Sequence, residues 1–216
     1  IEEADQLVAV LEVLKSDAEK GDFIIENKFE DVHSKIEYVL TEQLGDLGKK
    51  IHTARSRNDQ ILAALHLYLK AEIKKLKELT HDFFKLLMDL AEQHKDKLLP
   101  GYTHFQVAMP SSFGLWFSAY AESLIDDVTL LNAALKIVDQ NPLGSAAGYG
   151  SSFPIDRKAT TYQLDFADLK YNVIAAQMSR GKAEKTSANA MAGIAATLSK
   201  LAMDICLYMG QEHNFI

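Results

Sequence analysis

Apolar residues recur every three or four positions through three long stretches of the chain. The first stretch runs from Asn58 to about Leu98 and contains neither proline nor glycine. This spacing places apolar side chains on one face of an α-helix, so we expect a single long amphipathic helix here. The apolar positions are Ile61, Leu65, Leu69, Ile73, Leu76, Leu79, Phe83, Leu86 and Leu90.

Two more long helices are predicted by the same spacing. One follows Pro110 and stops at Asn141-Pro142. Its apolar positions are Phe113, Phe117, Tyr120, Leu124, Val128, Leu131, Leu135 and Val138. The other runs from about Ala183 to Glu212, and its apolar residues are spaced alternately three and four residues apart, as in a coiled coil. Its apolar positions are Met191, Ile194, Leu198, Leu201, Ile205 and Tyr208.

Strand signals are nearly absent, so the pattern predicts an all-α fold. The helices are much longer than the usual length of about 11 residues. A small chain with such helices exposes long apolar stripes unless other helices cover them, so we expect a bundle completed by oligomerisation. We interpret residues 1–57 as the end of an N-terminal helical region and residues 58–216 as a central long-helix bundle domain.

Composition excludes several other classes of protein. The formal net charge of -7, with no long basic run, argues against a nucleic-acid binder. The single cysteine, Cys206, fits a reducing compartment such as the cytoplasm. No apolar run reads as long enough to span a membrane, and no signal-peptide pattern opens the chain. Because the chain starts without methionine at Ile1 and stops at Ile216 just after a helix, we expect both ends to be cuts in a longer protein.

The segment that leads into the first long helix is one candidate for chemistry. Ser56 followed by Asp59 is a capping-box pattern. The start of a helix offers free N–H groups and a positive dipole end, which suit a carboxylate. The guanidinium of Arg57 can bind a carboxylate through two parallel hydrogen bonds, and Asn58 adds an amide donor. The alternative is an ordinary helix cap with solvated arginines.

The segment between Pro100 and Pro110 is a second candidate. Thr103 and His104 are expected on a short non-helical connector near a helix start, where a histidine can act as an acid or a base near neutral pH. The alternative is a structural or solvated histidine. The glycine- and serine-rich residues 141–157 lack the lysine of a phosphate-binding loop and follow no strand, so a tight loop between helices is expected. Histidines elsewhere lack metal-ligand spacing, and no metal is expected.

Several motifs together resemble those of the argininosuccinate lyase family, within the aspartase/fumarase superfamily. His52-Thr-Ala-Arg-Ser-Arg-Asn-Asp-Gln60 is similar to the family's first conserved region. Gly101-Tyr-Thr-His-Phe-Gln-Val-Ala-Met-Pro110 is similar to the second. Further matches, in the same order and spacing, are Glu30-Asp-Val-His33, Pro142-Leu-Gly-Ser145 and Phe153-Pro-Ile-Asp-Arg157. The resemblance therefore covers nearly the whole chain.

The resemblance implies a C–N lyase of the amidine-lyase type in arginine biosynthesis. The reaction is the reversible β-elimination of argininosuccinate to arginine and fumarate, without a metal or an organic cofactor. The resemblance gives His104 an acid/base role. It assigns substrate contacts to Asn58 and Thr103, with Ser56, Arg57, Gln106 and His33 also at the substrate. It further implies a cytoplasmic homotetramer whose sites are shared between subunits.

The chain also departs from the family pattern. The flexible loop that carries the partner serine of His104 would begin after Ile216, so this chain by itself is expected to be catalytically incomplete. Ala175 and Gly181 stand where members usually have acidic residues. Two alternatives therefore stay open. One is another fumarate-releasing C–N lyase, acting for example on adenylosuccinate or a modified citrulline. The other is an inactive crystallin-like structural homologue.

The length of the first helix adds a geometric expectation. Some forty residues separate Asn58 from His104, which corresponds to about 60 Å at 1.5 Å per residue. No proline or glycine suggests a kink. We therefore expect that Asn58 and His104 of one chain cannot serve the same site, and that different subunits assemble each site.

Overall fold

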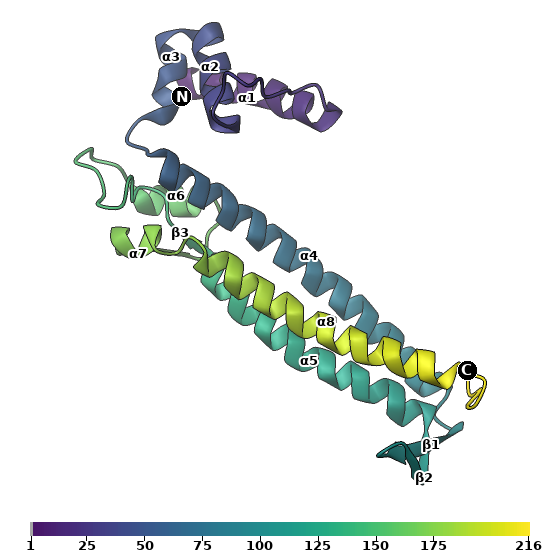
Figure 1. Cartoon of the computed structure of the whole chain (residues 1–216). Helices are drawn as coiled ribbons and strands as arrows, with labels where there is room; N and C mark the ends of the chain where they lie inside the picture. The colour runs from purple at the N-terminus through teal and green to yellow at the C-terminus, as the bar shows by residue number, and fades with distance from the viewer. Residues whose placement is uncertain (1) are drawn as a thin grey trace.

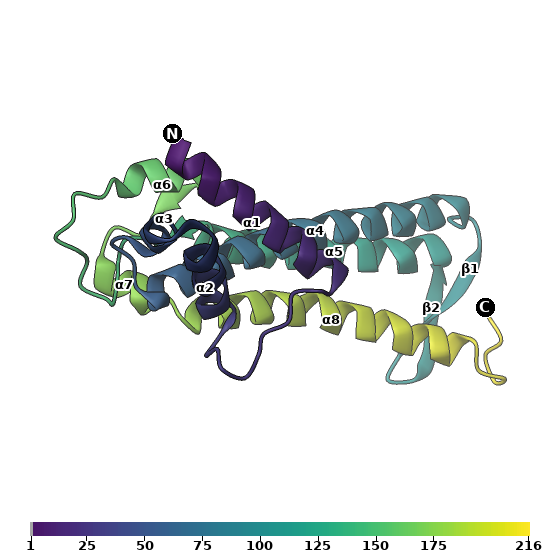
Figure 2. The same ribbon diagram turned by 90° about the horizontal axis from the view of Figure 1, so that it is seen from above.

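The computed structural model describes residues 2–216, and its centre is a bundle of long helices. These are α4 (Arg57–Gln93), α5 (Phe113–Val138) and α8 (Lys182–Tyr208). Figures 1 and 2 show α5 and α8 running along α4 for most of its length. The prediction of an all-α fold with long helices is therefore confirmed.

The bundle core follows the apolar spacing seen in the sequence. Towards the start of α4 the buried residues are Ile73, Leu131, Ala134, Val138, Ala183, Ala190 and Ile194. Towards its end they are Leu87, Leu99, Trp116, Ala121, Leu124 and Leu201. Alanines at several contact positions let the helix axes approach closely, since the distance between axes depends on the side chains at the contact.

Helix α4 ends earlier than the sequence pattern indicates. It stops at Gln93, because the following residues form a β-hairpin of β1 (Leu98–Thr103) and β2 (Gln106–Ser112). The connector expected between two helices is thus paired antiparallel, with Pro100 opposite Pro110. Both strands are edge strands, where a proline's missing N–H is tolerated.

The other end of the bundle carries shorter elements. They are α6 (Arg157–Gln163), α7 (Val173–Gln177) and a parallel pair of β3 (Gln140–Asn141) with β4 (Asp168–Leu169). Beyond the start of α4 lie α1 (Glu2–Lys20), α2 (Val32–Leu44), α3 (Asp46–Lys49) and the 3-10 turn η1 (Lys50–His52). The division into regions 1–57 and 58–216 stays a prediction.

Two leucines of the predicted α4 stripe face outward in the single chain. Leu79 is 57% exposed and Leu86 is 51% exposed, because the other bundle helices cover only part of the α4 surface. Helices α5 and α8 also expose large apolar side chains, namely Leu115, Ile125, Leu130, Ile137, Met191, Leu198, Met203 and Leu207. The outer faces of the bundle are therefore rich in uncovered apolar groups.

Helix α8 corrects one expectation from the sequence. By length and composition it is apolar enough to cross a membrane, with a mean hydropathy of 1.5 over 18 residues. The expectation that no apolar run reaches that length was therefore wrong, because the alanines between the larger apolar residues raise the mean. Helix α8 packs against α5, but only 17% of this apolar window is buried in the single chain.

Candidate active site

The first predicted site segment forms the start of α4. Ser56 is the N-cap, and its Oγ accepts a hydrogen bond from the N–H of Asn58 at 3.2 Å. The Asp59 carboxylate accepts one from the N–H of Ser56 at 2.8 Å, which completes the capping box expected from the sequence. Asn58 itself is exposed. Its amide therefore lies in solvent beside the positive end of the helix dipole.

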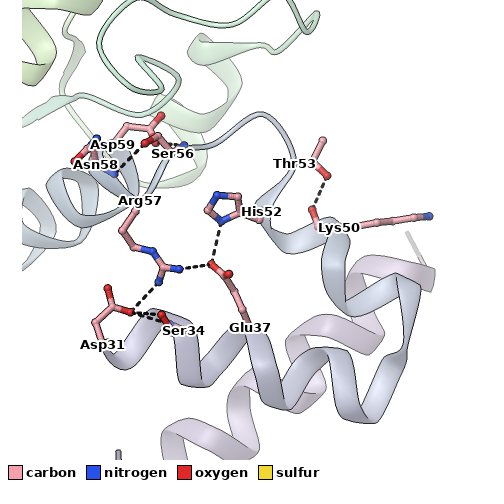
Figure 3. Close-up of polar contacts among 10 residues, drawn as sticks. All are labelled: Asp31, Ser34, Glu37, Lys50, His52, Thr53, Ser56, Arg57, Asn58 and Asp59. Atoms are coloured by element: carbon pink, nitrogen blue, oxygen red, sulfur yellow. Dashed lines mark hydrogen bonds and ion pairs between the residues drawn. The ribbon is translucent and has the colours of Figure 1, made fainter. Parts of the chain in front are cut away.

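Arg57 is held by two carboxylates of the preceding helical region (Figure 3). Its guanidinium lies 2.9 Å from Asp31 Oδ1 and 3.3 Å from Glu37 Oε1, and Glu37 also contacts His52 Nδ1 at 2.9 Å. The hydrogen bond from the Ser34 N–H lowers the pKa of Asp31, and the charge of Arg57 adds to this effect. Arg57 therefore ties the start of α2 to the start of α4.

Asp59 has a second role that its place in the motif does not reveal. The side chain is fully buried, and its Oδ2 accepts hydrogen bonds from the N–H groups of Gly144 and Ala146, each at 2.9 Å. These donors lie 85 and 87 residues away in the sequence. The capping-box pattern predicted the local bond to Ser56, but no sequence signal indicated these two.

Arg157 holds the same loop from the other side. Its guanidinium donates to the carbonyl oxygens of Leu143 at 2.9 Å, Lys170 at 2.8 Å and Tyr171 at 3.1 Å. Burial lowers the pKa of Arg157, and the negative charge of Asp59 partly opposes this. The glycine- and serine-rich segment is thus a tight loop, as expected. The buried Asp59 fixes it against α4, and the half-buried Arg157 ties it to residues 170 and 171.

The second predicted site segment forms the tip of the hairpin. Thr103 pairs with Gln106, so His104 and Phe105 form a two-residue turn. Both turn residues have left-handed backbones, with φ of +51° and +58°. Such conformations cost of order 1 kcal/mol or more for residues other than glycine, and they concentrate at functional sites. Thr103, His104 and Gln106 are all exposed.

His33 lies on the side of α4 that is roughly opposite Asn58. It lines a hollow of about 300 Å³ together with Arg55, Gln60 and the α4 residues Ala63, Ala64 and Leu67. At 3.6 residues per turn, Gln60 and Leu67 point to the side of the helix roughly opposite Asn58. The structure therefore places His33 near the same end of α4 as Asn58 but behind the helix.

The two predicted site segments lie at opposite ends of the bundle (Figure 1). Helix α4 has 37 residues between them, which is about 55 Å at 1.5 Å per residue. Ser56, Arg57, Asn58 and His33 gather at one end, and Thr103, His104 and Gln106 gather at the other. The expected separation of Asn58 from His104 within one chain is therefore observed. Among residues 2–216, no group of three or more His, Cys, Asp or Glu side chains could hold a metal ion.

The positions that depart from the family pattern have local structural roles. Gly181 has φ of +79° immediately before α8, a conformation that favours glycine over an acidic residue. Ala175 lies in the first turn of α7, where its N–H donates to the N-cap side chain of Asn172 at 2.9 Å. Both replacements are thus compatible with the local backbone.

Solved structures of other proteins share the long-helix bundle of this chain. An EDDS lyase variant with bound fumarate superposes with a TM-score of 0.88 at 24% identity, over 99% of this chain and 41% of that one. A fumarate lyase:delta crystallin from Brucella melitensis gives 0.69 at 22% identity, over 80% of this chain and 38% of that one. At these identities the likeness shows the fold alone, a bundle of long helices.

Sequence comparison then gives the family. A family model described as "Lyase" matches residues 1–216, so the chain belongs to this lyase family. It is 58% identical to the argininosuccinate lyase of Parabacteroides distasonis over 100% of this chain and 48% of that protein. It is 54% identical to that of Bacteroides thetaiotaomicron over the same shares. The chain spans about half the length of these relatives, and the resemblance to argininosuccinate lyases is confirmed.

Proposed function

We propose that the whole protein is an argininosuccinate lyase, which splits argininosuccinate into arginine and fumarate in arginine biosynthesis. The observation that carries this proposal is the identity of 58% and 54% to argininosuccinate lyases across the entire chain. The arrangement of the site segments supports it, because a helix start with an exposed amide suits a dicarboxylate substrate.

The proposed reaction is a β-elimination. A base removes a proton from the carbon next to one carboxylate of the succinyl half. The electron pair left behind forms the C=C bond of fumarate, the C–N bond breaks, and the guanidino nitrogen leaves with a proton from an acid. Because the carbon acid is weak, charge must be stabilised on the adjacent carboxylate. The N–H groups at the start of α4 and the exposed amide of Asn58 supply donors for this charge.

His104 is the proposed acid/base residue. Its exposed position at the tip of a two-residue turn lets it reach a substrate held by another chain, and Thr103 and Gln106 beside it offer hydrogen-bonding side chains. Ser56 and Arg57 support the opposite side of the site through the cap of α4 and the ion pairs to α2. His33 stays a proposed substrate residue, although it lies behind α4.

The proposed assembly is a homotetramer with sites shared between subunits. Two observations support it. The 37 residues of α4 keep Asn58 and His104 of one chain too far apart for one small substrate. The outer faces of the bundle expose the leucines Leu79 and Leu86 along with other apolar groups, which a second copy would cover. We also propose a cytoplasmic location and no nucleic-acid or membrane partner.

The test is an assay of the full-length protein for fumarate, whose conjugated double bond absorbs ultraviolet light. Argininosuccinate is expected to give fumarate, and adenylosuccinate is expected to give none. Activity on adenylosuccinate alone would move the protein to another fumarate-releasing lyase. A folded tetramer that is inactive on both would be an inert structural homologue.

A further inference from the structure

We propose that Asp59 is a positioning residue of the active site, which fixes the turn at residues 144–148 and the first turn of α4 as one unit. This inference rests on the proposed function. Asp59 is not expected to touch the substrate, because its side chain is fully buried. It would act through Asn58, its neighbour on the helix, whose side chain faces solvent.

One carboxylate joins the two backbone segments. Oδ1 of Asp59 closes the α4 cap by accepting from the Ser56 N–H, and Oδ2 accepts from both Gly144 and Ala146. A buried carboxylate is costly unless its lone pairs are satisfied, and three N–H groups satisfy it here. The helix start cannot shift relative to the turn without breaking these charge-assisted bonds.

The turn itself needs external support. Gly144 has φ of +85° and Ala146 has φ of +50°, so an alanine holds a left-handed conformation that only surrounding contacts can maintain. Gln177 supplies a second support, since its Nε2 donates to Ser145 Oγ at 2.8 Å and to the Ala146 carbonyl at 3.0 Å. Asp59 and Gln177 therefore hold the same strained turn from two directions.

The consequence for activity follows from geometry. Substrate-positioning groups must be held within fractions of an ångström, and a misplacement of about 1 Å can cost about 10²-fold in rate. Asn58 is covalently linked to Asp59 and lies in the same helical turn. Loosening Asp59 would therefore move Asn58 and the free N–H groups beside it, although none of these groups would be changed chemically.

The test uses Asp59→Asn in the full-length protein. The amide keeps an acceptor for Ser56 but turns an NH₂ group towards the N–H groups of Gly144 and Ala146, so the turn loses its support. We expect kcat to fall by about 10²-fold. The matched control is Asp156→Asn, because the exposed Asp156 caps α6 through one oxygen that the amide retains. The control is expected to keep wild-type activity.

Mixed oligomers separate positioning from general destabilisation. Asp59→Asn refolded together with His104→Asn is expected to regain activity, because some sites then combine an intact α4 start with an intact hairpin. Asp59→Asn refolded with Asn58→Leu is expected to stay inactive, since both changes affect the same part of the site. The reference pair is Asn58→Leu with His104→Asn.

The outcomes are distinct. If the reference pair recovers and Asp59→Asn with His104→Asn does not, Asp59 has no positioning role. Wild-type activity in Asp59→Asn also overturns the proposal. If Asp59→Asn does not fold, Gln177→Ala takes its place in the same pairings, and kcat is expected to fall by about tenfold. Wild-type activity of Gln177→Ala overturns the proposal, and so does recovery of activity with both His104→Asn and Asn58→Leu. A wild-type protein that releases no fumarate shows instead that the proposed function is wrong.

Discussion

Asn58 lies in the first turn of helix α4 and His104 lies beyond the opposite end of this helix, so about 55 Å of continuous helix separates them. A substrate with a succinyl and an arginine half is far shorter than this helix. If both residues serve one site, they must come from different chains, and the oligomer is then obligatory for activity.

The first prediction tests this arrangement directly. Full-length Asn58→Leu and His104→Asn are each expected to be inactive. When equal amounts are denatured and refolded together, about one site in four should carry neither change, which sets the recovery near a quarter of the wild-type rate. The measurement is fumarate release. Mixed oligomers that form, as shown by differently tagged chains, and yet remain inactive would contradict a shared site.

The second prediction concerns His104 alone. Changing it to asparagine should lower activity by about two to four orders of magnitude, the usual range for loss of a general acid or base. The fold should persist, because asparagine tolerates the left-handed backbone at this exposed turn. Circular dichroism and fumarate release are the measurements, and His81→Asn on the exposed side of α4 is the control. Near-normal turnover would remove His104 from the mechanism.

The third prediction concerns Arg57. Lysine keeps the charge but cannot bridge Asp31 and Glu37 with a planar fork. We expect Arg57→Lys to raise KM and to lower the free energy of unfolding by about 0.5 to 1 kcal/mol, since these ion pairs are partly exposed. The control is Arg55→Lys, because Arg55 lines the hollow that also holds His33 and forms no ion pair with Asp31 or Glu37. Equal losses of stability in both variants would argue against the ion pairs.

The fourth prediction is a pH dependence of stability that arises from His66. This residue is buried, and its Nδ1 lies 2.9 Å from the Val138 carbonyl and 3.1 Å from the Gln140 carbonyl, so Nδ1 carries the proton of a neutral ring. Burial lowers the pKa of His66, although both carbonyls oppose this.

A lowered histidine pKa means that the unfolded chain binds the proton first as the pH falls. The free energy of unfolding should therefore decrease as the pH drops below about 6.5, the ordinary histidine value, and should not change for this reason above it. Urea unfolding between about pH 7.5 and 5.5 measures this. His66→Gln should be less stable overall but should show a smaller slope, and an unchanged slope would assign the effect to other groups.

The fifth prediction tests self-association through the exposed face of α4. Leu86→Lys places a charge where an apolar group would be covered by a second copy, so the proposed tetramer should dissociate into smaller species. Light scattering on the full-length protein measures the mass. Lys85→Ala, at an exposed neighbouring position, is the control. A Leu86→Lys protein that remains tetrameric would place the interface elsewhere.

The local features of this protein could be predicted from its sequence. The three long helices follow from apolar spacing, and the capping box of Ser56 and Asp59 follows from residue types at fixed offsets. Both depend on interactions between residues one or a few turns apart, which the order of the chain specifies. The separation of Asn58 from His104 follows in turn, because an uninterrupted helix has a fixed rise.

Contacts between distant segments were decided only by the tertiary structure. The hairpin was missed because His104-Phe105 is not a usual two-residue turn sequence, and its strands carry prolines. The ion-pair partners of Arg57 could not be predicted either, because folding brings Asp31, at the N-cap of α2, and Glu37 of α2 beside its guanidinium. The bonds of Asp59 to Gly144 and Ala146 join segments 85 or more residues apart. The sequence determines the charge and shape of each side chain. Its hydrogen-bond and ion-pair partners depend on which groups lie close to it once the chain is packed.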